Sequence, residues 1–463
     1  MEFVNRVDEL KRLAHWWSDP DARLALVLGR RRVGKTALIR EFVRRGESAG
    51  FGQVVHHTGA GRGRAAELAL LSEAVRAAGL FRGSRDLQQR PFDNWDDALD
   101  ALADAARDHP VLVVLDEFPE LVVTSPELPN VLRAFLDGIN SECRLRLLLA
   151  GSAVRHMAGL AEERAPLYGR IDLSLHLHPF RPHEAAMMLP ALAPADRAVV
   201  YGLVGGVPLY LSWWDQERSV VDNLTELACE PTGRLVSEGD LVTATEVERG
   251  EYPKAVLYAI ANGKTKHNEI KQAIGAEPSR TLDRLVEMRM VERLAPVTAG
   301  RTTQRRYQIA DNFLAFHVGL LSRFRSGIER GAGKSVCKAL IAGLDDHLGK
   351  PWEAAVRDHL WRIASQEALG DGVVDIGPWW RDRPSVEIDA VALAGRDRRP
   401  VAAAEVKWAR TVDGRRLAWQ LAGKAEQVPG MVDAPKLVLA ARESVTDAPD
   451  DALVVTAADV FDN

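Results

Sequence analysis

The chain has 463 residues, of which 46% are hydrophobic and 27% charged, and its formal net charge at pH 7 is -5. This composition is ordinary for globular protein, and the length is too great for a single core, so we expect about three domains. The three cysteines lie far apart without metal-site spacing, which argues against structural zinc and disulfides and fits a reducing cytosol. No window reaches the roughly 18 uninterrupted apolar residues of a membrane span, so we predict a cytoplasmic protein without membrane contact.

The first predicted strand leads into a glycine-containing loop and then a helix. Residues 23–45, RLALVLGRRRVGKTALIREFVRR, hold the pattern G-x4-G-K-T in this setting. Glycines let such a loop curl, so that backbone N–H groups at the helix start surround phosphate oxygens. Lys35 would reach the β- and γ-phosphates of ATP, and the Thr36 hydroxyl would hold Mg²⁺. The predicted nucleotide-binding loop consists of Gly29, Arg30, Arg31, Arg32, Val33, Gly34, Lys35 and Thr36.

Two later apolar runs end in polar residues. HPVLVVLDEFPEL has the form of a parallel strand that is buried on both faces and meets a ligand at its carboxyl end. We predict that Asp116 binds Mg²⁺ directly or through water, and that Glu117 polarises the attacking water. LRLLLAGSAV ends near Ser152, where a γ-phosphate sensor would lie. Alternation with helices at 96–107 and 127–139 predicts an α/β fold with a doubly wound parallel sheet.

Six segments together resemble one family. FVNRVDELKRL, LGRRRVGKTALIREF, VLVVLDEFPEL, LLLAGSAV, PLYGRIDLSLHLHPF and GLVGGVPLYL occur in the order of the archaeal-type ATPase family of archaea and bacteria, which is similar to AAA+ and STAND NTPases. The resemblance implies an ASCE P-loop core, with an extra strand between the Walker strands and a catalytic glutamate. It also implies that Arg170 acts on the γ-phosphate, in cis or from a neighbouring subunit, and that Pro208 packs near adenine. A surface ion pair and a helix-start proline are the simpler alternatives.

Residues 252–310 favour a winged helix-turn-helix. Three short amphipathic patterns, two with glycine stops, precede a basic stretch that is typical of a two-stranded wing. Because the net charge is negative, DNA contact would depend on such local basic patches; an interdomain spacer is the alternative. The segment GAGKS at 331–335 lacks the first glycine of a P-loop, and we predict a flexible linker there. The residues placed on the presumed recognition helix and wing are Ser279, Arg280, Asp283, Arg284, Arg301, Arg305 and Arg306.

Two apolar runs near the C-terminus carry charges that a buried strand normally avoids. Asp389 lies in EIDAVAL, and Glu405 and Lys407 lie in VAAAEVKW. Residues two apart on a strand share a face, so Glu405 and Lys407 would lie side by side, with Asp389 close by if the runs pair as a hairpin. Two carboxylates would supply oxygen ligands for Mg²⁺ or Mn²⁺, and Lys407 would act on water or on developing charge. A solvated Glu/Lys pair on an exposed strand is the alternative.

The order of helix, three strands and helix around this pattern resembles the PD-(D/E)xK nuclease fold, although the proline of the first half-motif is absent. In the family named above, a domain of this kind, of unknown function and the DUF234 type, follows the ATPase and the winged helix. The resemblance implies that Glu353, on the leading helix, completes the metal site. On the following helix, Gln420 and Lys424 are candidates for contact with a backbone phosphate of DNA, with plain helix surface as the alternative.

We therefore expect a P-loop ATPase domain with a helical lid at 1–235, a winged helix-turn-helix at 236–325 and a nuclease-like domain at 340–463. In this interpretation the ATP state controls DNA binding or metal-dependent cleavage. Two alternatives stay open: an ATP-switched regulator whose third domain binds without cleaving, and a STAND-like signalling or defence scaffold. Retention of both Asp116 and Glu117 favours nucleotide turnover over a static switch. The sequence leaves open the DNA structure, the trigger and the oligomeric state, including a homo-oligomer.

Overall fold

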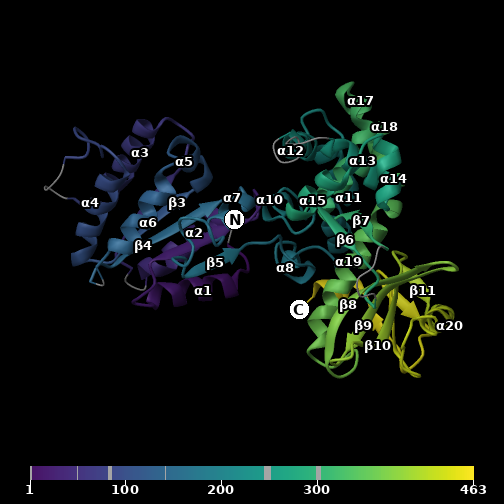
Figure 1. Cartoon of the computed structure of the whole chain (residues 1–463). Helices are drawn as coiled ribbons and strands as arrows, with labels where there is room; N and C mark the ends of the chain where they lie inside the picture. The colour runs from purple at the N-terminus through teal and green to yellow at the C-terminus, as the bar shows by residue number, and fades with distance from the viewer. Residues whose placement is uncertain are drawn as a thin grey trace. The chain divides into compact units, whose positions relative to one another are not determined.

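The computed structural model describes residues 3–48, 51–81, 86–140, 142–244, 252–298 and 304–462. The chain divides into two compact units, Met1–His178 and Pro179–Asn463, and Figure 1 shows their elements. None of the helices in this described part combines the length and the apolarity that crossing a bilayer requires. The finer division into three domains at 235 and 325 stays a prediction.

The first unit is built around a parallel sheet. Its strands are β1 (Leu24–Leu28), β2 (Gln53–Thr58), β3 (Val111–Asp116), β4 (Leu145–Gly151) and β5 (Leu173–His176). They lie in the order β2-β3-β4-β1-β5, with Leu24 opposite Leu147 and Ala25 opposite Leu173. Every pairing is parallel, which confirms the predicted α/β class and parallel sheet. The extra strand β4 lies between β1, which precedes the glycine-containing loop, and β3, which ends at Asp116.

Helices cover both faces of this sheet. They are α1 (Val7–Ser18), α2 (Lys35–Ser48), α3 (Arg64–Ala77), α4 (Trp95–Asp108), α5 (Phe118–Thr124), α6 (Leu128–Gly138) and α7 (Val154–Gly159). Leu26 and Val113 enter the core formed with α3 to α6, whereas Val27 and Val114 enter the core formed with α1 and α2. Because side chains alternate along a strand, strands covered on both faces are buried at every position, as β1, β3 and β4 are, and they are apolar except for Asp116 and Arg146.

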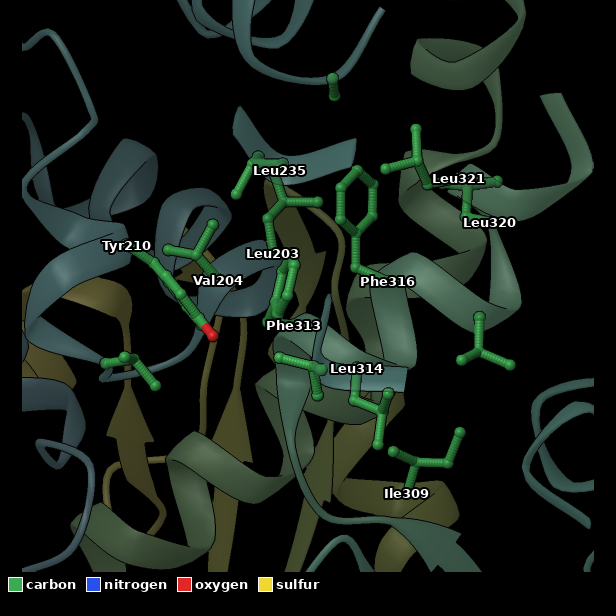
Figure 2. Close-up of a cluster of buried hydrophobic side chains, with 14 of the residues drawn as sticks. Leu203, Val204, Tyr210, Leu235, Ile309, Phe313, Leu314, Phe316, Leu320 and Leu321 are labelled. Carbon is green, nitrogen blue, oxygen red and sulfur yellow. The ribbon is translucent and has the colours of Figure 1, made fainter. Parts of the chain in front are cut away.

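The second unit begins with a helical region. Its helices before the C-terminal sheet are α8 (Pro182–Ala186), α9 (Pro194–Val204), α10 (Pro208–Leu211), α11 (Val220–Ala228), α12 (Arg234–Val242), α13 (Pro253–Ala261), α14 (His267–Ile274), α15 (Ser279–Glu287), α16 (Asn312–Gly319), the 3-10 helix η2 (Leu321–Phe324), α17 (Arg325–Glu329) and α18 (Gly333–Ala342). Figure 2 shows part of their shared core, in which Phe313 and Phe316 of α16 meet Leu203 of α9 and Leu235 of α12. Since α16 is apolar on nearly all sides, it lies inside the unit.

Three of these helices and a short ribbon follow the pattern expected for residues 252–310. Helices α13, α14 and α15 precede the antiparallel strands β6 (Val291–Leu294) and β7 (Arg306–Ile309). The prediction of a flexible linker at 331–335 is wrong, because Gly333 begins α18. Val336 and Leu340 of α18 are buried. The two glycines at 331 and 333 suggested a linker, but the apolar residues that follow them form the buried side of an amphipathic helix.

The C-terminal part of the second unit is a mixed sheet flanked by helices. Its strands are β8 (Val373–Asp382), β9 (Ser385–Ala394), β10 (Arg399–Val406), β12 (Lys436–Ala440) and β14 (Leu453–Val455), with a separate pair β11 (Thr411–Asp413) and β13 (Ser444–Thr446); the helices are α19 (Leu344–Ala364), α20 (Gly414–Ala425) and α21 (Ala457–Phe461). The sheet order is β14-β12-β10-β9-β8. Strands β9 and β10 are antiparallel with Ala390 opposite Ala404, so the predicted hairpin of the two charged runs is confirmed. Trp352 of α19 and Leu421 of α20 belong to two different cores of this part.

Candidate functional site

The loop Gly29–Thr36 joins β1 to α2 with a backbone that requires its glycines. Gly34 has φ of +96°, and a Cβ atom on Gly29 would lie 2.5 Å from a backbone carbonyl oxygen. Lys35 is only 5% exposed, and its Nζ donates hydrogen bonds to the carbonyl oxygens of Gly29 (2.8 Å) and Arg30 (3.1 Å). The loop is thus curled around the ammonium group of Lys35, whose hydrogen-bond acceptors in this structure include backbone carbonyl oxygens of the loop itself. Of the remaining loop residues, Arg31 is exposed, Arg32 is half-buried at φ +71° and Val33 is buried.

A buried arginine before the first helix braces this loop. Arg6 Nη2 donates to the carbonyl oxygens of Val33 (3.1 Å) and His178 (2.6 Å), while Nη1 bonds Glu9 Oε1 (2.9 Å). Arg6 was not among the predicted site residues. A contact between residues that are 27 positions apart leaves no signal in local spacing.

Thr36 and Asp116 meet at the edge of the sheet where the loop begins the helix. Thr36 Oγ1 donates to Asp116 Oδ2 (2.7 Å), and the backbone N–H of Glu117 donates to Asp116 Oδ1 (2.9 Å). His56, on the adjacent strand β2, lies with Nε2 3.8 Å from Asp116 Oδ2. Burial would raise the pKa of Asp116, but the interactions with His56, Thr36 and the backbone N–H together hold it below its ordinary value. Asp116 is therefore ionised at neutral pH.

His56 is a second residue that the sequence analysis did not select. Its Nε2 is buried and, within the described part of the chain, has no hydrogen-bond partner. A histidine inside a strand is commonly a packing residue, so only the pairing of β2 with β3 reveals its place beside Asp116. A buried nitrogen without a partner is costly, which makes this position suited to a bound polar group.

Glu117 follows Asp116 in a left-handed backbone conformation, with φ 48° and ψ 45°. Its Oε2 accepts a hydrogen bond from Ser152 Oγ (2.9 Å) and a longer one from the Ser152 backbone N–H (3.4 Å). Non-glycine residues rarely adopt this conformation, and such strain is often found at functional sites. The carboxyl ends of β3 and β4 thus bring together Asp116, Glu117 and Ser152.

Arg170 and Pro208 have other neighbours. Arg170 forms two hydrogen bonds with Asp137 at the end of α6, from Nε (2.6 Å) and Nη2 (2.9 Å). This ion pair lowers the pKa of Asp137 and raises that of Arg170. Pro208 is the first residue of α10 in the second unit, the helix-start position named as its alternative. The roles of both residues at a nucleotide stay predictions.

The second group of predicted residues gathers on β9 and β10. Asp389 Oδ2 accepts a hydrogen bond from the backbone N–H of Val406 (2.7 Å), across the hairpin. Glu405 is 4% exposed, and its Oε1 accepts from Lys407 Nζ (2.7 Å). Lys424 Nζ, from α20, contacts both oxygens of Glu405 at 2.8 and 2.7 Å. Two ammonium groups therefore neutralise one buried carboxylate.

Glu353 approaches this group from α19. Its two oxygens accept from Lys350 Nζ at 3.0 and 2.8 Å. The pKa of Asp389 is raised to about 6, by burial first and then by the charge of Glu353, with Glu405 adding to the effect. Nevertheless, in the ranges that the structure describes, no three His, Cys, Asp or Glu side chains form a group that could hold a metal ion. In this arrangement Glu405 and Glu353 are held by lysines, and the three carboxylates do not form a cation site.

The basic residues of the helix-and-ribbon module differ in exposure. Arg280 and Arg305 are exposed and Arg284 is half-buried, whereas Arg301 lies outside the described residues. Arg306 does not face solvent freely: its guanidinium lies 4.4 Å from the centre of the Trp380 ring and 3.2 Å from Glu387 Oε2. Of the other helix residues, Ser279 bonds Glu277 (2.6 Å) and Asp283 pairs with Arg293. The ribbon is therefore attached to the β8–β9 hairpin through Arg306.

Comparison with known families divides the chain in a similar way. Residues 3–213 match the model of an ATPase domain found predominantly in Archaea. Residues 318–417 match a family of archaeal and bacterial proteins of unknown function. The first match contains the Thr36, Asp116 and Glu117 group, whereas the second contains Asp389, Glu405 and Lys407 but ends before Lys424.

Individual relatives agree with this division. An uncharacterized protein of Methanocaldococcus jannaschii is 26% identical over 416 residues, which cover 88% of this chain and 87% of the relative. An uncharacterized ATP-binding protein of the same organism is 51% identical over 41 residues, covering 9% of this chain and 70% of the relative. The solved Walker-type ATPase of Pyrococcus abyssi aligns with 68% of this chain and 96% of its own, at 20% identity and a TM-score of 0.50, and so shows a shared fold. Residues 3–213 thus match the family of ATPase domains found predominantly in Archaea, and residues 318–417 match a family of unknown function.

Proposed function

We propose that the first unit binds ATP with Mg²⁺ and hydrolyses it. The observation that carries this proposal is the meeting of Thr36 and Asp116, 2.7 Å apart, with Glu117 and Ser152 on the same sheet edge. In support, the matching family consists of ATPase domains, and one short relative is described as ATP-binding. A hydroxyl and an ionised carboxylate are oxygen donors of the kind that Mg²⁺ takes beside nucleotide phosphates.

Each residue has a distinct role in this proposal. The loop Gly29–Thr36 would surround the phosphates with backbone N–H groups, and Lys35 would leave its carbonyl partners for the β- and γ-phosphates. Thr36 and Asp116 would hold Mg²⁺, which when bound neutralises charge that develops on the phosphates. Glu117 would orient and polarise water, and Ser152, which now bonds Glu117, would exchange that bond for the γ-phosphate.

Two substitutions separate binding from hydrolysis. Lys35→Ala removes the fixed positive charge, so we expect ATP binding to be lost in titration calorimetry. Glu117→Gln keeps the phosphate contacts, so we expect ATP binding to remain and phosphate release to fall by at least about a hundredfold, within the usual contribution of a general base. An equal rate of phosphate release from Glu117→Gln and parent would show that another residue activates water.

We propose as a second function that the second unit binds DNA and cleaves it with a divalent metal. The observation in favour is that three charged residues, of a kind that buried strands normally exclude, lie together at one hairpin: Asp389, Glu405 and Lys407. Glu405 is buried between Lys407 and Lys424. Asp389, Glu405 and Glu353 would hold Mg²⁺ or Mn²⁺ only after Lys407 and Lys424 leave Glu405 and Lys350 leaves Glu353. Such a metal would supply positive charge at a phosphate. Helices α13 to α15 with the β6–β7 ribbon would act as a winged helix that holds DNA.

A nuclease assay on the full chain tests this second function. Plasmid and branched DNA would be incubated with Mg²⁺ or Mn²⁺, with and without ATP. We expect parent protein to cut, and Asp389→Ala and Lys407→Ala both to be inactive. Thermal shift with Mn²⁺ distinguishes the two variants, because Asp389→Ala would lose metal-dependent stabilisation whereas Lys407→Ala would keep it. Absence of both cleavage and metal stabilisation in the parent would favour a regulator or scaffold with an inactive nuclease fold.

A further inference from the structure

Trp419, on α20, is the most exposed of the large hydrophobic side chains in the described part of the chain, at 78%. An isolated exposed hydrophobic residue is common, but an exposed indole one helical turn from two exposed arginines is a different arrangement. Arg415 and Arg416 are exposed on the same helix, one turn before Trp419. We call Arg415, Arg416, Trp419, Gln420 and Lys424 the α20 face.

Helical spacing places these residues on one side of α20. Residues three or four positions apart are neighbours on a helix surface. Trp419 lies four positions after Arg415 and three after Arg416, so it is next to both arginines, and Gln420 lies four before Lys424 and is next to it. The opposite side of α20 carries Leu417 and Leu421, which are buried in the core of the sheet. The α20 face is thus the outer surface of a helix that packs on one face of the C-terminal sheet, against β9, β10 and β12, and Figure 1 shows α20 beside this sheet.

The charge of the α20 face has one sign. The sequence of α20, GRRLAWQLAGKA, contains two arginines and one lysine but no aspartate or glutamate. Neither the Arg415 nor the Arg416 guanidinium forms an ion pair within the described residues, whereas Lys424 at the end of the face contacts Glu405. A surface with this charge is complementary to a phosphate backbone, and it leads directly to the candidate cleavage site.

We propose that the α20 face binds a single-stranded stretch of DNA, with an unpaired base stacked on Trp419 and backbone phosphates on Arg415 and Arg416. This proposal rests on the proposed DNA-cleaving function and adds the class of substrate. Bases of an intact duplex are stacked on one another and present no free face to an indole, whereas bases of a flap, gap or single-stranded end do. The substrate of the second unit would therefore be DNA with unpaired bases next to the scissile phosphate.

Fluorescence anisotropy on the full chain tests this substrate class. The probes are labelled oligothymidine, a blunt duplex and the same duplex with a single-stranded flap, with EDTA present to prevent cleavage. We expect the parent to prefer the flap and the single strand. Trp419→Ala should weaken binding to both of these by at least about fivefold, since stacking of one base is lost, and should leave the blunt duplex unaffected. Trp419→Phe should retain most of the preference, because a phenyl ring still stacks.

A matched control and three contrary outcomes complete the experiment. Trp361→Ala removes another exposed indole, on α19, and should bind all probes like the parent. If Trp419→Ala binds the flap as tightly as the parent does, the substrate class is wrong while DNA binding stands. If the parent binds none of the probes, the proposed DNA function fails and the inference fails with it. If light scattering shows a parent dimer that Trp419→Ala converts to a monomer, the α20 face is a protein interface and the inference is wrong.

Discussion

Thr36 Oγ1 and Asp116 Oδ2 are joined by a 2.7 Å hydrogen bond, so the end of the loop Gly29–Thr36 is tied to the end of β3. We expect Asp116→Asn to weaken ATP binding in the presence of Mg²⁺ by about tenfold or more, because a charged oxygen ligand is replaced by a neutral one. Binding with EDTA should change little. Calorimetry under both conditions checks this, and Thr36→Ser, which keeps the hydroxyl, is the control. Equal losses with and without Mg²⁺ would show that Asp116 supports the fold of the loop rather than the metal.

Arg306 and its exposed neighbour Arg305 should behave differently. Arg306 stacks on Trp380 and pairs with Glu387 and, at 3.6 Å, with Asp382. We expect Arg306→Ala to lower the free energy of unfolding of the second unit by about 1–2 kcal/mol. Arg305→Ala should change it by less than about 0.5 kcal/mol. Denaturant titration followed by tryptophan fluorescence measures both.

The same pair tests which arginines face DNA. Each lost phosphate contact lowers the slope of log affinity against log salt by about one. We expect the combined change of Arg280, Arg284 and Arg305 to alanine to lower this slope, and the further change of Arg306 to leave it unaltered, since that guanidinium is engaged with Trp380. A fall in slope on changing Arg306 alone would show that it leaves the hairpin to contact DNA.

Two histidines of α19 predict that the second unit loses stability in mild acid. Burial lowers the pKa of His347 to about 4, and burial with the charge of Arg362 lowers that of His359 to about 4, against an ordinary value of 6.5. Below pH 6.5 these histidines take up protons in the unfolded chain but not in the folded chain. Above pH 6.5 they therefore do not lower the free energy of unfolding. Between pH 6.5 and 4 it should fall, with a limiting slope of about 1.4 kcal/mol per pH unit for each histidine.

Comparison of variants isolates this effect from other titrating groups. The double variant His347→Gln, His359→Gln should lose less stability than the parent between pH 7 and pH 5, as measured by urea unfolding at each pH. His109→Gln, at an exposed position, is the control and should follow the parent. Identical pH dependence in the parent and the double variant would contradict the prediction.

Cys229 should resist alkylation in the native protein. Its thiol is fully buried, and burial together with the neighbouring Cys337 thiol raises its pKa to about 12. Because the thiolate is the reactive form, iodoacetamide at pH 8 should leave Cys229 unmodified until guanidinium chloride unfolds the chain. Mass spectrometry of tryptic peptides measures this, and rapid modification of Cys229 without denaturant would show that α11 and α18 separate in the native state.

The elements that local pattern predicts are those whose residues lie close together along the chain. The loop Gly29–Thr36 was predictable because glycine spacing, lysine and the flanking apolar periodicity occupy one short segment. The hairpin of β9 and β10 was predictable because two apolar runs joined by a short connection leave few other pairings. The candidate site on this hairpin was predictable from the same residues, because an apolar strand normally excludes charges such as Asp389 and Glu405.

Contacts that depend on packing between distant segments were not predictable. Arg6 reaches Val33 across the edge of a core, and His56 meets Asp116 only because β2 pairs with β3. Lys424, a candidate for contact with a DNA phosphate or for plain helix surface, places its Nζ on Glu405, 19 positions away, since an uncompensated buried carboxylate would be costly. In each case the contact depends on which side chains are buried together in the folded chain, and local sequence spacing does not predict it.

The strand order of the first unit also bears on how the protein is made. Strand β1 is synthesised first, yet its hydrogen-bonding neighbours are β4 and β5 rather than β2. While the chain emerges from the ribosome, one edge of β1 therefore stays open until β4 has been added and the other until β5, which begins at Leu173. Open strand edges invite pairing with other chains. The loop Gly29–Thr36 between β1 and α2 accordingly acquires its shape late, when translation has passed the end of the unit at His178.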